Sequence, residues 1–325
     1  MYRESKSTSA FWALSAMALL AACTDVETGE VVGDPVEEVT LADIIVEDGY
    51  SPVSTWENGL GHIGVDMNTN SGQAYRFVVD TGASVNVIGE TAAATLGISG
   101  IQSIADVDIG GFAVPSLQLV VLDLSSVNRA LVAVGADPID GVLGAPFLSD
   151  YRGLLDYAAD ALYFSDQDPG ASFQDDTGEI LDAGGYVPVP LQRNPVSFLE
   201  LEAMINGDEP HNFIIDTGAV AATLDLETAE NLGLSVEPSA SPAITVGGAL
   251  AAFQTTVDHL DVGRVDTGEQ QLAVIDLSGF NRQLEQIGAR PMNGLVGADF
   301  LIEHEAVVDY TGLRLFLRDA ASNEK

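Results

Sequence analysis

The chain has 325 residues, a length that accommodates two domains of ordinary size, each with its own hydrophobic core. Its 12 lysines and arginines stand against 49 aspartates and glutamates, which gives a formal net charge of −37. This charge argues against nucleic acid as a partner, because phosphate binding requires clustered basic residues, and it is typical of a strongly solvated surface.

The first 22 residues are predicted to be a signal peptide. Arg3 and Lys6 precede the apolar run AFWALSAMALLAA, which is short for a membrane span and typical of a signal-peptide core. The run ends in LAAC at residues 20–23, which resembles the bacterial lipobox, after which the leader is cleaved and the thiol of Cys23, the only cysteine, is lipidated. We therefore expect a lipid-anchored protein of the bacterial cell envelope that faces the periplasm or the exterior. An ordinary secretory leader with an incidental cysteine is the alternative.

Residues 23–49 are predicted to form an acidic tether. They contain nine acidic residues and no basic one, together with Thr, Gly and Pro, a composition typical of a flexible and self-repelling segment. Part of this range, LADIIV at residues 41–46, is compatible with an edge strand. The folded body is expected to begin at Tyr50.

An internal duplication organises the rest of the chain. FVVDTGAS at residues 77–84 predicts a buried strand that runs into a tight turn, and FIIDTGAV at residues 213–220 repeats it 136 positions later (213 minus 77). GVLG at residues 141–144 and GLVG at residues 294–297 are 153 positions apart (294 minus 141). The two spacings indicate one colinear repeat with a single gap of 17 residues (153 minus 136).

The duplication predicts a first lobe at residues 50–165, a linker at residues 166–185 and a second lobe at residues 186–319. In each lobe, short β-branched runs divided by Gly, Asn, Asp or Pro predict strands and hairpins. ETAAATLGI at residues 90–98 and LETAENLGL at residues 226–234 each predict a short helix that a glycine ends. A further short helix is expected near the Phe-Leu pair of each copy, so the fold class is mainly β.

One Asp-Thr-Gly turn from each copy would suit the hydrolysis of an amide bond if the two met between the lobes. Asp80 and Asp216 would then lie too close for both to ionise, so that one carboxyl acts as a base and the other as an acid. The base would take a proton from water while the acid protonates the carbonyl oxygen, and no covalent enzyme intermediate would form.

The neighbours of the two aspartates fit the same arrangement. Gly82 and Gly218 would let the backbone turn sharply and bring its amides towards the carboxylates. The hydroxyls of Thr81 and Thr217 would hydrogen-bond across the seam and fix the spacing. Because two copies in one chain supply this symmetry internally, we expect a monomer.

These residues resemble the retropepsin-like aspartic proteases, of the bacterial periplasmic or lipoprotein kind, with two lobes in one chain. The resemblance covers nearly all of residues 50–318 and includes the closing strands LLDYAADALYF and VVDYTGLRLFL. It implies duplicated, closed-barrel-like β lobes with a cleft between them. It also implies an aspartic endopeptidase that cuts peptides or proteins with Asp80 and Asp216 as its catalytic dyad and needs no cofactor.

Two departures from that family concern the cleft. Its members cover the cleft with a glycine-tipped hairpin, the flap, and the second copy has a candidate in residues 242–260 with its tip near Gly247 and Gly248. The first copy lacks this insertion, so we expect a single flap from the second lobe. Family members often use a polar residue such as Ser84 to hold the substrate backbone; Val220 replaces it in the second copy, so one side of the cleft is expected to hold substrate less firmly.

The main alternative is a weak or inactive relative that binds peptides or proteins without cutting them. The missing first flap and Val220 favour it, whereas the presence of both aspartates argues against it. A calcium-dependent structural lipoprotein is a further alternative, suggested by DVD at residues 106–108 and DQD at residues 166–168. No calcium-loop spacing follows either run.

Two further sets of residues receive no functional role from the sequence. The four histidines show no metal-ligand spacing and are expected to be packed or on the surface, namely His62, His211, His259 and His304. No metal is therefore expected. Asp140, before the first repeated glycine strand, becomes Asn293 in the second copy.

Overall fold

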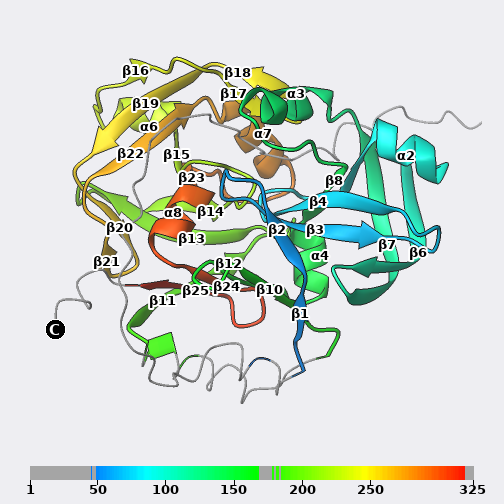
Figure 1. The fold of residues 1–325 in the computed structure, drawn as a ribbon. Coiled ribbons are helices and arrows are strands. Elements are labelled where there is room, and N and C mark those ends of the chain that lie inside the picture. The colour runs from blue at the N-terminus through cyan, green and yellow to red at the C-terminus, as the bar shows by residue number, and fades with distance from the viewer. Residues whose placement is uncertain (1–44, 46–48, 168–177, 179–180, 183, 319–325) are drawn as a thin grey trace, which may run out of the picture.

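The fold is known from a computed structural model that describes residues 45, 49–167, 178, 181–182 and 184–318. The predicted leader, with Cys23, lies outside the described residues. Two β lobes, one from each copy, stand on a sheet that they share, with the first copy in blue to green and the second in green to red (Figure 1).

The first lobe is a ring of strands. Its members are β2 (Thr55–Glu57), β3 (Ile63–Asn68), β4 (Ala74–Asp80), β5 (Val87–Gly89), β6 (Ile101–Ile109), β7 (Phe112–Leu122) and β8 (Gly141–Gly144). They pair in the order β2-β3-β4-β8-β5-β7-β6, and an additional pairing of β3 with β6 closes the ring. The buried Val and Phe of β4 and the other strands fill its interior.

The second lobe repeats this arrangement. Its strands are β12 (Gln192–Arg193), β13 (Leu199–Ile205), β14 (His211–Ile215), β15 (Thr223–Asp225), β16 (Glu237–Pro238), β19 (Ala252–Val257), β20 (Leu260–Val262), β21 (Val265–Asp266), β22 (Gln270–Ile275) and β23 (Gly294–Val296). β13 pairs with β20 as β3 pairs with β6, and the parallel pair β14–β23 matches β4–β8. The predicted fold class, mainly β with duplicated barrel-like lobes, is confirmed.

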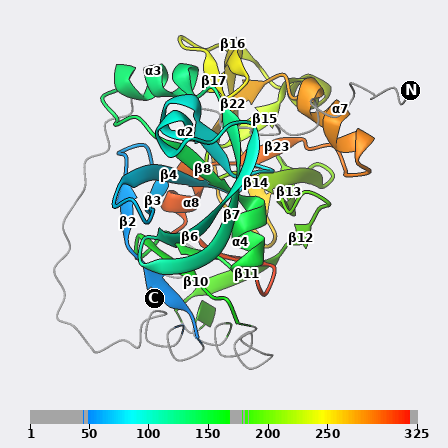
Figure 2. The ribbon, with the colours of Figure 1, turned by 90° about the vertical axis from the view of Figure 1, so that its right-hand side faces the viewer.

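The shared sheet has six strands, three from each copy, and lies below both lobes in Figures 1 and 2. The strands in order are β1 (Ser51–Val53), β10 (Ala161–Phe164), β9 (Leu154–Asp156), β24 (Val307–Asp309), β25 (Arg314–Arg318) and β11 (Tyr186–Pro190). At its centre Leu155 of β9 pairs with Val308 of β24. These two residues occupy the same position of the repeat, so the pseudo-twofold axis of the duplication passes between them.

Short helices follow the strands. Four lie where the sequence predicts a short helix, namely α2 (Glu90–Leu96), α4 (Ala145–Asp150), α6 (Leu226–Asn231) and α8 (Ala298–Glu303). Two more were not predicted from the sequence, α3 (Ser125–Ala133) and α7 (Ser278–Gln286). Asp123 Oδ1 accepts the Ser125 amide at 2.8 Å, and its counterpart Asp276 accepts the Ser278 amide at 2.9 Å. This repeated Asp-Leu-Ser is a start signal for a helix, because a carboxylate satisfies amides that the first turn leaves free.

Packed residues extend into the ranges predicted as tether and linker. Ile45 and Leu181 are both buried. They belong to one cluster with residues of the six-stranded sheet, which also contains Tyr50, Leu154, Tyr163, Tyr186, Val307 and Phe316. Ile45 is helical, so it does not belong to an edge strand over residues 41–46. Ile45, within the range predicted as a tether, thus packs on the folded body, and the burial of its side chain is favourable.

The structure gives Asp140 and Asn293 the same role. Asp140 Oδ2 accepts the backbone amide of Arg76 at 2.9 Å, and Asn293 Oδ1 accepts that of Asn212, the repeat equivalent of Arg76, at 3.0 Å. Each contact ties the strand that leads to an Asp-Thr-Gly turn to the loop before the neighbouring glycine strand. An amide can replace a carboxylate in this contact because the contact uses only an acceptor oxygen. Asn293 makes a further hydrogen bond, from its Nδ2 to Thr228 Oγ1 at 3.0 Å.

No helix in the described part of the chain has the length and apolar character needed to cross a membrane.

Candidate active site

Asp80 and Asp216 meet where the two lobes face each other. Asp80 ends β4, Asp216 directly follows β14, and both side chains are fully buried. A Cβ on Gly82 would lie 2.4 Å from Cγ of Asp216, and one on Gly218 would lie 2.5 Å from Cγ of Asp80. Each turn thus touches the carboxyl group of the opposite lobe, and only glycine leaves room for this approach.

Backbone amides fix one oxygen of each carboxyl group. Asp80 Oδ1 accepts the Gly82 amide at 2.8 Å, and Asp216 Oδ1 accepts the Gly218 and Ala219 amides at 3.0 and 3.1 Å. The Oδ2 atoms of both aspartates are buried and receive no N–H or hydroxyl donor. A buried oxygen without a donor is costly, and a proton shared by the two carboxyl groups would satisfy both.

Burial raises the pKa of both carboxyl groups. The pKa of Asp80 is raised to about 6, mainly by desolvation. The pKa of Asp216 is raised well above its usual value, by desolvation first and then by the negative charge of Asp80. The pair therefore keeps one proton in a pH range where an exposed aspartate has lost it.

Two threonines lock the turns together across the seam. The Thr81 amide donates to Thr217 Oγ1 at 3.1 Å, and the Thr217 amide donates to Thr81 Oγ1 at 3.0 Å. The Thr81 hydroxyl in turn donates to the Ile215 carbonyl at 2.6 Å, and the Thr217 hydroxyl donates to that of Val79 at 2.7 Å. Each buried hydroxyl is satisfied as donor and acceptor, so the distance between the two turns is well defined.

A single hairpin, β17 (Ala243–Thr245) with β18 (Gly248–Leu250), lies in the segment predicted as the flap. At its tip, Thr245 Oγ1 accepts the Gly247 amide at 3.1 Å and donates to the Gly248 carbonyl at 3.0 Å. In the first lobe residues 97–100, which join α2 to β6, contain no strand. The hairpin therefore has no counterpart there.

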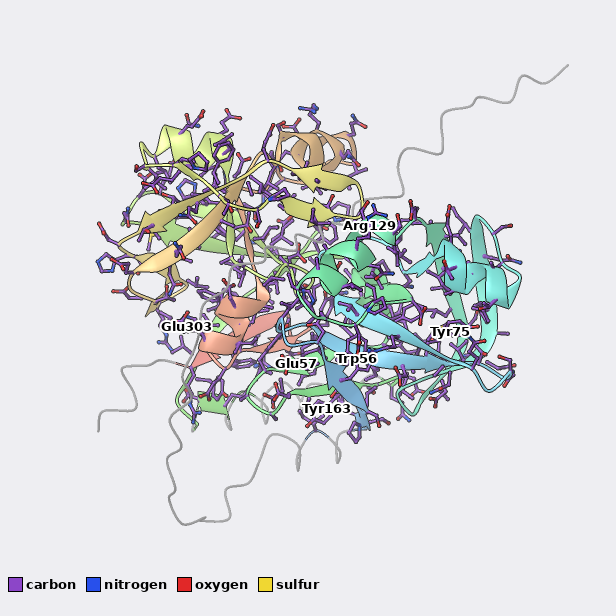
Figure 3. All side chains as sticks on the ribbon, turned by 45° about the horizontal axis from the view of Figure 1, so that its top comes forward. Trp56, Glu57, Tyr75, Arg129, Tyr163 and Glu303 are labelled. Carbon is purple, nitrogen blue, oxygen red and sulfur yellow. The ribbon has the colours of Figure 1, made fainter. Side chains whose placement is uncertain are left out.

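The hairpin of the second lobe packs against α3 of the first lobe. Ile244 and Val246 lie against the apolar cluster that contains Val127 and Leu131 of α3. Figure 3 shows α3, which carries the labelled Arg129, next to the yellow hairpin. The same cluster includes the buried Ala83, directly after the first Asp-Thr-Gly. The hairpin thus bridges the two lobes beside the dyad.

Ser84 and Val220 follow the two turns at equivalent positions, and both are partly exposed. Val220 packs against the apolar cluster that the hairpin contacts. The difference between the copies is therefore a difference between a hydroxyl and an apolar side chain next to the dyad.

Three buried side chains near the dyad were not predicted from the sequence. Tyr157 and Tyr310, equivalent in the repeat, have buried hydroxyls without a hydrogen-bond partner. Burial raises the pKa of each, followed for Tyr157 by the charge of Asp216, so both stay neutral. His62 Nε2 lies 3.1 Å from the carbonyl oxygen of Gly218. The repeated Asp-Tyr pair marks the tyrosines in the sequence, but nothing there marks their approach to the dyad.

Among the residues that the structure describes, no cluster of three or more His, Cys, Asp or Glu side chains is arranged to hold a metal ion. The chemistry available at the seam is proton transfer to and from two carboxyl groups.

Comparison with known proteins gives a family. The model of a family described as aspartyl protease matches residues 65–147 and 201–300, which is more than half of the chain and includes both Asp-Thr-Gly turns. The search of curated proteins gave no match.

Two solved structures are similar to parts of the chain. One is a retropepsin-like aspartic protease from Rickettsia conorii, with 21% identity and a TM-score of 0.30 over 41% of this chain and 98% of that one. The other is Basic 7S globulin from soybean, with 12% identity and a TM-score of 0.40 over 85% of this chain and 96% of that one.

Proposed function

Because the chain belongs to the aspartyl protease family, we propose that it is an endopeptidase in which Asp80 and Asp216 activate water against a peptide bond. The observation that carries this proposal is the contact of each Asp-Thr-Gly turn with the opposite carboxyl group, together with the two buried Oδ2 atoms that have no donor. Two carboxyl groups that share one proton hold an acid and a base side by side.

Burial raises the pKa of both carboxyl groups, so the pair keeps one proton to share. In the cycle proposed here, Asp216 holds that proton as the acid and Asp80 is the base. It takes a proton from water, the water oxygen adds to the carbonyl carbon, and Asp216 gives its proton to the carbonyl oxygen. The resulting diol then collapses: a diol proton returns to Asp216, the C–N bond breaks, and the proton held by Asp80 passes to the amine.

The hairpin β17–β18 and α3 are proposed to cover the bound peptide. The apolar contact of Ile244 and Val246 with the α3 cluster supports this, since it carries the hairpin from its own lobe to the other. α3 would then contact the single flap at the place where a second flap would otherwise meet it. Substrate would enter when the hairpin leaves α3, and apolar side chains beside the cleaved bond would fit the cluster.

The test is cleavage of a mixed-peptide library by the full chain from acid to neutral pH. The inhibitor is a peptide with a tetrahedral hydroxyl carbon in place of the scissile carbonyl, a group that imitates the diol. Peptide cleavage that this inhibitor blocks would support the proposal. A folded protein that binds this peptide but cuts nothing at any pH would overturn it in favour of a binding protein.

The pH profile of cleavage is expected to fall on its acid side near pH 6. Activity needs Asp80 ionised, and its pKa is raised to about 6, so activity is lost as the pH falls through that value. Asp216 must keep its proton, and burial and the charge of Asp80 raise its pKa, so the loss of activity on the alkaline side is expected above the usual titration range of an aspartate. Initial rates on one peptide across pH measure this. A maximum at strongly acid pH would contradict it.

We propose in addition that the chain is a monomer anchored in the bacterial envelope through lipid on Cys23, with residues 1–22 removed. The support is the LAAC run and the absence of any other cysteine in the sequence. Cys23→Ala is expected to move the protein from the membrane fraction to the soluble fraction, as measured by fractionation of cells that express it. A wild-type protein already in the soluble fraction would refute the anchor.

A further inference from the structure

His62 belongs to the first lobe but contacts the catalytic turn of the second. It lies in the loop between β2 and β3, is fully buried, and places Nε2 at 3.1 Å from the Gly218 carbonyl oxygen. Gly61, with a φ of +82°, brings the loop against α8. A Cβ there would be 2.6 Å from Cδ1 of Ile302, so the loop is tightly packed on the second lobe.

The hydrogen bonds around His62 define its tautomer. Asn58 Oδ1 accepts the backbone amides of Leu60 and His62 at 3.0 and 3.4 Å, which fixes the orientation of the Asn58 side chain. Its Nδ2, a donor only, lies 2.8 Å from His62 Nδ1, so Nδ1 accepts and carries no proton. The ring proton is therefore on Nε2 and is donated to Gly218. Burial lowers the pKa of His62 to about 4, so the ring is neutral at neutral pH.

The carbonyl that His62 holds belongs to the peptide that also holds Asp216. The peptide unit between Gly218 and Ala219 is planar, so fixing its C=O fixes the direction of its N–H. That N–H, of Ala219, donates to Asp216 Oδ1 at 3.1 Å. The path from imidazole to carboxyl is thus two hydrogen bonds joined by one rigid and polarisable unit.

The second lobe contains the same loop without the histidine. Asn194, the repeat equivalent of Asn58, accepts the backbone amides of Val196 and Phe198 at 3.1 Å each. Phe198 occupies the position of His62 and is likewise buried. A phenyl ring has no N–H, so it cannot hold the carbonyl of Gly82 in the corresponding way.

We propose that His62 is a positioning residue: its Nε2–H fixes the Gly218–Ala219 peptide and thereby the orientation of the Asp216 carboxyl group. The kinetic consequence rests on the proposed peptidase function, whereas the tautomer and its hydrogen bond do not. The dyad is then unequal by construction, because one of its two aspartates is held from the opposite lobe and the other is not held in this way.

The kinetic test uses His62→Phe, which copies the side chain of the second lobe into an equivalent loop. kcat on a peptide that the wild type cuts is expected to fall by about 10- to 100-fold with KM nearly unchanged, since a small misorientation of a catalytic group affects the chemical step. His62→Gln, which keeps an N–H donor, is expected to recover part of kcat. His304→Phe is the control at another buried histidine, whose ring packs against Phe300 at a tilted angle, and is expected to keep wild-type kcat.

Wild-type kcat in His62→Phe, or a kcat in His62→Gln no higher than in His62→Phe, would overturn the proposal. A second measurement needs no activity and no folded variant: nitrogen NMR of the labelled full-length wild type at neutral pH. We expect a neutral imidazole with its proton on Nε2. An Nδ1–H tautomer or an imidazolium would overturn the proposal even if the protein cleaves peptides. If nothing is cleaved but the expected tautomer is found, the peptidase function fails and the hydrogen bond to Gly218 stands.

Discussion

Asparagine in place of Asp80 or Asp216 is expected to reduce peptide cleavage to background, a loss in kcat of at least about 10²- to 10⁴-fold. An amide has the size of the carboxyl group but neither accepts a proton from water nor supplies one to the carbonyl oxygen. Either substitution alone should suffice, since the acid and the base act in one step. Single-turnover rates with each variant measure the loss.

The folded state is expected to survive these substitutions. The native state holds the Asp80 proton more tightly than the unfolded chain does, because its pKa is raised to about 6. The proton on Asp80 therefore stabilises the folded state at low pH, and this contribution is lost as the pH rises from about 4 to about 6. Asparagine does not ionise, so the variant does not suffer this loss. Asp156→Asn is the matched control: Asp156 is also buried with a raised pKa but lies in the six-stranded sheet. Undiminished cleavage by Asp80→Asn or Asp216→Asn would refute the dyad.

Valine in place of Thr81 or Thr217 is expected to destabilise the protein strongly, although it leaves the volume of the side chain almost unchanged. The Thr81 hydroxyl donates to the Ile215 carbonyl and accepts the Thr217 amide, so valine leaves two buried groups unpaired. At about 1–3 kcal/mol for each such group, the free energy of unfolding should fall by about 2–6 kcal/mol. Thr217→Val should cost a similar amount, because it breaks the equivalent pair of bonds. Urea unfolding measures both.

Thr81→Ser separates the hydroxyl from the methyl group. It keeps both hydrogen bonds and removes one buried methyl, so a loss of only about 1 kcal/mol is expected. Equal losses for Thr81→Ser and Thr81→Val would mean that packing, and not hydrogen bonding, joins the turns.

Much of the fold could be predicted because each element expected in one copy can be checked against the equivalent residues of the other copy. FVVDTGAS and FIIDTGAV, followed in the same order by GVLG and GLVG, indicated two copies. The resemblance to aspartic proteases is confirmed by the family model. The 17-residue gap marked the segment that holds β17 and β18. α3 and α7 were missed because the apolar residues of α3 include the strand former valine and those of α7 are few, so the Asp-Leu-Ser start is their common signal.

The surroundings of the dyad were harder to predict, because they depend on which parts of the two lobes touch. A histidine in a loop is usually a surface or packed residue, and only the docking of the loop against α8 brings His62 to Gly218. A signal did exist: the copies share Asn58 and Asn194 but differ at His62 and Phe198. Positions where two otherwise matched copies diverge are candidates for a role that only one copy has.

The pairing of Leu155 with Val308 shows how a duplicated single chain differs from a dimer of identical chains. In an assembly of two identical chains, a mutation at such a position on the axis appears on both sides at once, and the interface must accept it twice. Here the two halves are separate stretches of one chain and can mutate independently, so a leucine faces a valine. The same independence allows one half to carry a hairpin or a histidine that the other half lacks. Two copies in one chain can thus take on different roles, which two identical chains cannot do.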